Sequence, residues 1–138
     1  MTNLKSHAHC VYNLQIHIVF VTKYRNKVID TDILNRMKEI FSKLCEAQKC
    51  SLIEFNGESD HVHLLIDLAP DIAISKLVNI LKTISSREIR KEFKDRVDKF
   101  YWKPVFWSSA YCVISSGGAS IDVLKQYIQN QDSPSPKI

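Results

Sequence analysis

The stretch Ser59-Asp60-His61-Val62-His63-Leu64-Leu65-Ile66-Asp67-Leu68 has the alternating polar and apolar pattern of a β-strand. Successive side chains on a strand point to opposite faces, so its four even-numbered aliphatic side chains are predicted to face the core. His61 and His63 share the other face with Leu65 and Asp67. Two neutral imidazoles so close together can bind one divalent cation, although a sheet face on which they meet solvent or a hydrogen-bond partner is the structural alternative.

Length and composition predict one folded domain. The chain has 138 residues, of which 45% are hydrophobic, and this is enough for a single core. We expect that domain to span residues 1–132 and residues 133–138 to form a disordered tail, because two Ser-Pro pairs cannot continue a helix. The net charge of +4 is compatible with a polyanionic partner without requiring one.

Other features of the sequence exclude several classes. Its four cysteines form no Cys-x-x-Cys pair, and neither an export signal nor an apolar run of membrane-spanning length occurs, so we expect a cytoplasmic protein. No Gly-x-x-x-x-Gly-Lys motif is present, and three glycines in all leave little room for a phosphate-binding loop. We therefore expect no nucleotide cofactor and no contact with a membrane.

Four segments have the pattern of strands. The first spans residues 12–21, and the second spans residues 51–55. Asn56-Gly57 is a turn signal that connects the second strand to the one beginning at His61. The fourth strand is predicted over residues 110–115.

Three segments have apolar residues at helical spacing, over residues 30–48, 74–93 and 120–132. Asp30 and its neighbours can cap the first helix, and Gly117-Gly118 forms a flexible joint before the last. Between the second helix and the fourth strand lie the aromatic residues of 100–107. Most of these rings are expected to pack as a satellite core, and one or two could stack on exposed bases.

The order of elements predicts an α+β fold. Strand, helix, strand, strand, helix and strand fit a ferredoxin-like (RRM-like) antiparallel sheet with two helices on one face, followed by an additional C-terminal helix. In that arrangement the central strands have one uncovered face. His61 and His63 are predicted to lie there.

The C-terminal helix carries a second group of candidate site residues. Tyr127 and Gln131 are four residues apart, so they lie on the same side of the helix and can serve one site. They flank the apolar stripe of this helix, at the edge where it would meet the sheet. Taken alone, Tyr127 has an equally simple role as a packing residue.

These motifs together resemble the HUH single-tyrosine transposases of small insertion sequences. The resemblance covers nearly the whole chain: Lys23-Tyr24-Arg25 after the first strand, Asp60-His61-Val62-His63, Gly117-Gly118, and Gln126-Tyr127-Ile128-Gln129-Asn130-Gln131. It implies a transposase that cleaves and rejoins single-stranded DNA at the ends of its mobile element. These ends are expected to form DNA hairpins. It also implies a homodimer in which the tyrosine helix of one subunit completes the histidine site of the other.

The resemblance assigns roles to individual residues. Tyr127 is the nucleophile that forms a 5′-phosphotyrosine, and His61, His63 and Gln131 are the metal ligands. Such a mixed ligand set suits Mg²⁺ or Mn²⁺ without strong selectivity. A phenol with a pKa near 10 is a poor nucleophile at neutral pH, so stabilisation of the phosphate charge by a metal ion fits the chemistry.

A cationic and aromatic cluster follows the first strand. Lys23, Tyr24 and Arg25 can hold phosphates and stack a base, and we expect them to contact DNA together with Arg87 of the second helix. A solvated loop and a solvated helix face are the alternatives. Alanine at Arg25 is expected to weaken single-strand binding and to reduce its dependence on salt.

Three other functions are alternatives to this one. A non-catalytic module of ferredoxin-like fold could bind single strands by stacking, and it would need no metal. A replication-initiating or plasmid-relaxing HUH nuclease usually has additional domains, for which this chain has no space. A histidine-pair RNA phosphoesterase requires two separate His-x-Thr or His-x-Ser motifs, and the sequence contains no such pair.

Overall fold

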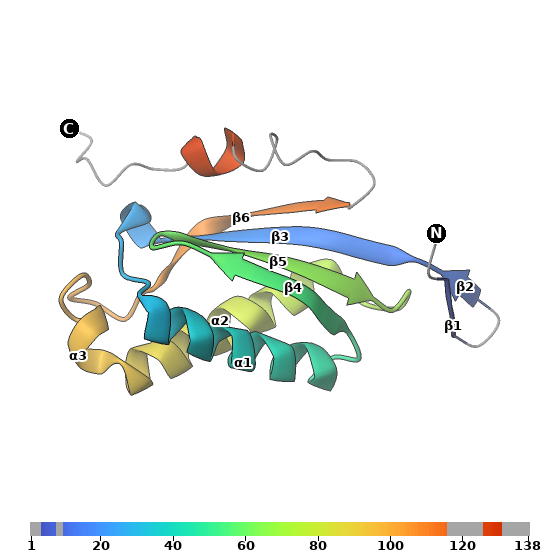
Figure 1. Cartoon of the computed structure of the whole chain (residues 1–138), viewed down its shortest axis with the longest axis horizontal. Helices are drawn as coiled ribbons and strands as arrows, with labels where there is room; N and C mark the ends of the chain where they lie inside the picture. Colours follow the sequence, from blue (N-terminus) through green and yellow to red (C-terminus); the bar gives the residue numbers. More distant parts are fainter. Residues whose placement is uncertain (1–3, 8–9, 116–125, 131–138) are drawn as a thin grey trace.

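The computed structural model describes residues 4–7, 10–115 and 126–130. Its centre is a four-stranded antiparallel sheet of order β4-β5-β3-β6. The strands are β3 (Leu14–Thr22), β4 (Ser51–Gly57), β5 (His61–Leu68) and β6 (Trp107–Ser115). Helices α1 (Thr31–Ala47) and α2 (Ile74–Glu92) cover one face of this sheet (Figure 1). The predicted ferredoxin-like fold is confirmed.

The core lies between the sheet and the two helices. Strands β3 and β5 contribute alternate side chains to it, and these are Ile16, Ile18, Phe20, Val62, Leu64, Ile66 and Leu68. Helices α1 and α2 complete the core with Ile33, Met37, Ile40, Phe41, Leu77, Val78, Leu81 and Ile89. The apolar face predicted for the strand at His61 is therefore the core face, which leaves the histidines on the opposite side.

The first helix begins and ends where its sequence predicts. Asp30 is the N-cap, and its Oδ1 accepts a hydrogen bond from the backbone N–H of Ile33 at 2.9 Å. This bond satisfies one of the four N–H groups that have no partner within the helix. The second helix ends at Glu92, one residue before the predicted limit, because Phe93 leaves helical geometry at φ −118° and ψ 38°.

The predicted turn at Asn56-Gly57 is wrong. Both residues belong to β4, where Asn56 pairs with His63 and Gly57 with Val62, and the chain reverses at residues 58–60. Gly57 is required by space, because a Cβ there would lie 2.9 Å from the carbonyl oxygen of His61. Its lack of a side chain lets the two strands approach, so the glycine acts within the strand.

The aromatic segment packs more centrally than predicted. Tyr101, Phe106 and Trp107 are buried in the main core, whereas Trp102 is 91% exposed. Strand β6 starts at Trp107, three residues before the predicted start at Ala110, because Trp107 already pairs with Thr22 of β3. The rings thus join the core of the sheet rather than a satellite cluster.

Four short elements were not predicted. Strands β1 (Lys5–His7) and β2 (Cys10–Tyr12) form a hairpin beside the sheet, and Lys5 forms an ion pair with Asp67. A 3-10 turn, η1 (Lys23–Arg25), follows β3, and α3 (Lys94–Val97) follows α2.

The predicted last helix falls largely outside the described residues. Residues 126–129 are helical and lie on the sheet face opposite α1 and α2 (Figure 1). Its predicted cap, the glycine joint, Gln131 and the tail over 133–138 all lie outside the described part. None of the described helices is both long enough and apolar enough to span a membrane.

Candidate active site

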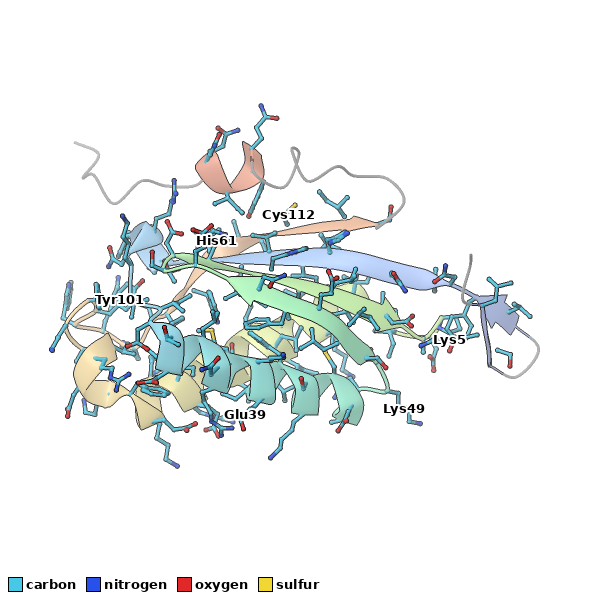
Figure 2. The ribbon with its side chains drawn as sticks, in the orientation of Figure 1. Lys5, Glu39, Lys49, His61, Tyr101 and Cys112 are labelled. Atoms are coloured by element: carbon cyan, nitrogen blue, oxygen red, sulfur yellow. The ribbon has the colours of Figure 1, made fainter. Side chains whose placement is uncertain are left out.

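The two histidines open strand β5 and lie on the face opposite the helices. Figure 2 places His61 on this side of the sheet, together with Cys112 of β6. On the neighbouring strand β3, Val21 is the register partner of His61 and Val19 that of His63. The alternation of the strand thus places both imidazoles beside a small apolar surface.

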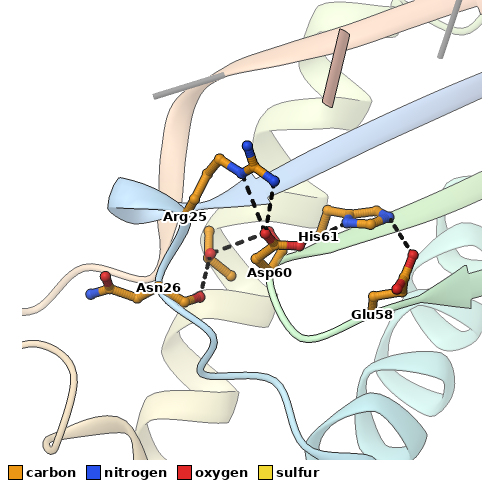
Figure 3. A network of polar contacts seen from close by, with 6 residues as sticks. Arg25, Asn26, Glu58, Asp60 and His61 are labelled. Atoms are coloured by element: carbon orange, nitrogen blue, oxygen red, sulfur yellow. Dashed lines mark hydrogen bonds and ion pairs between the residues drawn. The ribbon is translucent and has the colours of Figure 1, made fainter. Parts of the chain in front are cut away.

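His61 is held by the carboxylate that precedes it. Its Nδ1 lies 2.9 Å from Oδ1 of Asp60, and Oδ2 of Asp60 lies 3.1 Å from Nη2 of Arg25 (Figure 3). Burial alone would raise the pKa of Asp60, but the hydrogen bond with His61 and the charge of Arg25 outweigh it, so the pKa is lowered. An ionised carboxylate only accepts hydrogen bonds, so Nδ1 of His61 donates, and Nε2 of a neutral ring keeps its lone pair.

His63 contacts a third histidine, His17, which was not among the predicted site residues. Nδ1 of His17 lies 2.7 Å from Nε2 of His63, and the two rings stack with centroids 4.8 Å apart. Burial, and then the nearby His17, lower the pKa of His63. Because His17 shares a strand face with Val19 and Val21, the alternation of β3 was the available signal. A cation bound at Nε2 of His63 would replace its hydrogen bond with His17.

Tyr127, from the helical segment 126–129, packs on β3, the strand next to the one that carries His61 and His63. It packs with Ile128 against Val19 and Val21, the register partners of His63 and His61. Its hydroxyl oxygen is buried and has no hydrogen-bond partner within the described part of the chain. Burial, and then the nearby Cys112, raise the pKa of Tyr127, which keeps the phenol protonated.

The described residues can supply part of a metal site. They contain no group of three or more His, Cys, Asp or Glu side chains placed to hold a metal ion. His61 and His63 share one strand face, and a neutral His61 that donates from Nδ1 has its lone pair on Nε2, with Oε2 of Glu58 3.8 Å away, so this pair of donors fits a divalent cation. Gln131, the third predicted ligand, lies outside the described residues.

The four predicted DNA contacts fall in two places. Lys23, Tyr24 and Arg25 form η1, beside Asp60 and His61, and Tyr24 is 45% exposed. Arg87 belongs to α2, on the helix side of the sheet. There it lines a cavity of about 570 Å³ together with four other cationic side chains, which are Arg90, Lys91, Lys94 and Lys103.

Known proteins are similar to this chain over most of its length. Residues 10–131 match the family described as "Transposase IS200 like". The chain is 31% identical over 131 residues to the transposase for insertion sequence element IS200 of Salmonella typhimurium, covering 95% of this chain and 85% of that protein. It is 27% identical over 121 residues to the ISDra2 transposase TnpA of Deinococcus radiodurans, covering 88% of this chain and 86% of that protein.

A solved structure has the same fold. The crystal structure of a Deinococcus radiodurans protein assigned as a transposase superposes with a TM-score of 0.84 at 28% identity, over 94% of this chain and 98% of that one. The family match spans both histidines and Tyr127, and the relatives align over most of their length. The chain belongs to the IS200-like transposase family.

Proposed function

We propose that this transposase cleaves and rejoins single-stranded DNA at the ends of its insertion sequence, with Tyr127 as the nucleophile. The observation that supports this most is the position of Tyr127 on Val19 and Val21, the register partners of His63 and His61. A phenol and two imidazoles from distant parts of the chain thereby reach one region of the sheet. Such a combination suits phosphoryl transfer.

In the proposed reaction, the oxygen of Tyr127 attacks the scissile phosphorus. A bond forms between the tyrosine oxygen and phosphorus, and the bond to the 3′-oxygen breaks. The products are a 5′-phosphotyrosine and a free 3′-hydroxyl, and the proton lost by tyrosine balances the one gained by the leaving oxygen. One phosphodiester replaces another, so the step is reversible and a new 3′-hydroxyl can be joined without ATP.

A divalent cation, Mg²⁺ or Mn²⁺, is proposed at His61, His63 and Gln131. When bound, it would polarise the phosphate and offset the negative charge that develops on its oxygens. The hydroxyl of Tyr127 is buried in the described arrangement, so attack requires residues 126–130 to shift until this oxygen meets the phosphate. Among residues 126–130, only Tyr127 and Ile128 are half-buried, and the other three are exposed. Few buried contacts would be lost in such a shift, so its free-energy cost is small.

The test is denaturing gel electrophoresis of the protein with labelled single-stranded DNA from the element ends. Wild-type protein is expected to form a covalent adduct with Mg²⁺ or Mn²⁺ and none with EDTA. Tyr127→Phe removes only the hydroxyl and is expected to bind the DNA without forming the adduct. Binding without any adduct under either metal would contradict the proposal and favour a non-catalytic single-strand binding module.

We propose Lys23, Tyr24, Arg25 and Arg87 as DNA contacts. The first three lie beside the histidines, where a strand being cleaved would pass, and the exposed ring of Tyr24 could stack on a base. Arg87, on the other side of the sheet, lines the cationic cavity and could hold a DNA segment outside the cleaved strand, such as a hairpin end.

Arg87→Ala is expected to weaken DNA binding and to reduce the slope of log K against log salt by about 0.7–0.9, the range for one phosphate contact on single-stranded or duplex DNA. Binding measured by fluorescence anisotropy at several salt concentrations checks this. Arg36→Ala is the control, because Arg36 is engaged with Glu92 at 2.9 Å on the helix surface. Equal slopes for Arg87→Ala and wild type would remove Arg87 from the interface.

We also propose a homodimer with composite sites, formed along strand β6. This edge strand has nine residues and contains neither a charged residue nor a proline, the features that usually prevent edge pairing. The opposite edge, β4, contains Glu54 and a register irregularity between Leu52 and Glu54. Pairing of two copies is therefore expected at β6, and it would bring two histidine sites and two tyrosine segments into one assembly.

A further inference from the structure

We infer that Arg25 is a positioning residue for the histidine site, acting through Asp60 on His61. This inference rests on the proposed metal-dependent function, and it adds a role to Arg25 beyond contact with DNA. The three side chains form a continuous series of contacts from η1 to the start of β5 (Figure 3). Each link in this series has a defined geometry and a defined direction of hydrogen bonding.

The first link joins Arg25 to Asp60. Nε and Nη2 of Arg25 donate to the same oxygen, Oδ2 of Asp60, at 3.3 and 3.1 Å. Both side chains are largely shielded from water, with 24% of Arg25 and 13% of Asp60 exposed. A guanidinium with two nitrogens on one carboxylate oxygen restrains the rotation of that carboxylate, which a single flexible ammonium does less well.

The second link joins Asp60 to His61. Because Oδ2 is engaged by Arg25, the other oxygen, Oδ1, is directed at Nδ1 of the imidazole, at 2.9 Å. A carboxylate acceptor keeps the proton of a neutral imidazole on Nδ1 and leaves the lone pair on Nε2. Metal-binding histidines commonly donate their second nitrogen to a carboxylate in this way, which fixes both tautomer and ring orientation.

The backbone of η1 indicates that the position of Arg25 is costly to maintain. Tyr24 and Arg25 are consecutive non-glycine residues in the left-handed region, with φ of 60° and 54°. Neighbouring contacts hold the turn in this conformation. Lys23 N donates to Phe106 O at 2.8 Å, and Tyr101 Oη donates to Lys23 O at 2.7 Å.

The backbone of Asp60 is also bonded to Thr22, the last residue of β3 and the one that precedes the turn. Thr22 N donates to the carbonyl oxygen of Asp60 at 2.9 Å, and Thr22 Oγ1 contacts the same oxygen at 3.2 Å. These contacts hold the residue that precedes the strained turn against the residue that precedes His61. This attachment explains how a left-handed pair in one loop can determine the geometry of a histidine on another strand.

The inference is tested on DNA-free protein by titrating Mn²⁺ in calorimetry and by following free Mn²⁺ in electron paramagnetic resonance. Asp60→Ala is expected to weaken Mn²⁺ binding by about 10–100-fold, the usual effect of losing such a carboxylate. Arg25→Gln is also expected to weaken Mn²⁺ binding, but by less than Asp60→Ala does. Arg25→Lys keeps the charge without the two-nitrogen contact and should recover only part of the loss.

The sign of the Arg25 effect separates positioning from simple electrostatics. Removing a positive charge near a cation site would by itself strengthen Mn²⁺ binding. Weaker binding by Arg25→Gln therefore supports positioning, and unchanged or tighter binding by the folded variant overturns it. In the Asp60→Ala background, Arg25→Gln is expected to cause no further weakening of Mn²⁺ binding, because Arg25 positions His61 only through Asp60.

The His61 tautomer provides a second readout that does not require metal. Long-range ¹H–¹⁵N spectra of wild-type protein at pH 8 are expected to place the His61 proton on Nδ1. Asp60→Ala is expected to move that proton to Nε2, and an unchanged tautomer would overturn the inference. Asp60→Leu, which fills the space of the side chain but offers no acceptor oxygen, serves if the alanine variant does not fold.

Two controls separate this inference from the proposed function. Arg36→Gln disrupts a comparable contact, Arg36 with Glu92 at 2.9 Å, and is expected to bind Mn²⁺ as wild type does. His61→Ala is expected to lose Mn²⁺ binding. If wild type binds no Mn²⁺, or if His61→Ala binds Mn²⁺ as tightly as wild type, the proposed metal site is wrong. The positioning role of Arg25 is then wrong as well. If only Arg25→Gln retains full affinity, the metal site stands and the positioning role is wrong.

Discussion

Among single residues, Ser85 is important for stability although its side chain is small. It is fully buried in α2, and its Oγ accepts a hydrogen bond from Nε1 of Trp107 at 2.9 Å. Ser85→Ala would leave the indole N–H without a partner in the core, and we expect it to lower the free energy of unfolding by about 1–3 kcal/mol. Urea denaturation followed by tryptophan fluorescence measures this change.

The neighbouring serine is a suitable control. Ser86 is only half-buried, and its Oγ accepts from Nε of Arg90 near the surface, at 3.2 Å. Ser86→Ala is expected to change stability by less than about 0.5 kcal/mol. In a Trp107→Phe background, which lacks the indole N–H, the cost of Ser85→Ala should largely disappear. A cost that persists there would show that Ser85 acts through packing rather than through this bond.

The sequence was sufficient to place the histidines but not their partners. Alternation along one strand put His61 and His63 on the uncovered face, as the fold confirms. His17 was not selected, because its contact with His63 depends on the register between β3 and β5 and on side-chain rotation. The contact of Arg25 with Asp60 depends in the same way on two left-handed residues that no local pattern predicts.

At the scale of elements, the cap of α1 allows a prediction. Asp30→Ala removes the oxygen that accepts from Ile33 N, so we expect a loss of about 0.5–2 kcal/mol in the free energy of unfolding. Thermal denaturation followed by circular dichroism detects it. Asp32→Ala is the matched control, since Nη1 of Arg96 lies 3.0 Å from the carboxylate of both aspartates.

Asp32→Ala removes an exposed ion pair and a first-turn charge but no cap hydrogen bond. We expect the smaller loss from it, because exposed ion pairs contribute little and the dipole interaction of an exposed charge is modest. Equal losses in the two variants would mean that Arg96, rather than the cap, accounts for the role of Asp30.

The boundaries of helices and strands could be predicted from the sequence wherever local interactions determine them. The cap and periodicity of α1 predicted its limits, because both signals lie within the helix itself. The turn after β4 was misplaced, because Gly57 is selected by the space beside Leu34 and His61, which come from other elements. The early start of β6 likewise depends on pairing with Thr22, far away in the sequence.

At the scale of the whole molecule, the order of elements determined the fold, and the assembly is the property that a single chain leaves open. Tyr127 packs on an apolar cluster of Val19 and Val21, against which Cys112 and Ile114 also pack. A tyrosine segment from a second copy would meet the same side chains as the chain's own segment. The histidine site of one subunit could therefore be completed by the tyrosine of the other, at little change in contact energy.

A mixed dimer of Tyr127→Phe and His63→Ala subunits tests this exchange. Each variant alone is expected to form no adduct with element-end DNA. If composite sites form, the heterodimer pairs the intact histidines of one subunit with the intact tyrosine of the other. Random mixing of equal amounts makes about half of the dimers mixed, each with one complete site in two, so about a quarter of the wild-type adduct is expected.

If each chain instead uses its own tyrosine, every subunit of the mixed dimer lacks one essential group, and no adduct should form. Mixing must be verified by a size tag on one variant, so that heterodimers can be counted on a native gel. With heterodimers present, a complete absence of adduct would contradict the exchange and favour the arrangement in which Tyr127 lies on its own sheet. Tyr127 would then reach the phosphate from its position on Val19 and Val21 of its own sheet, after the shift of residues 126–130 described above.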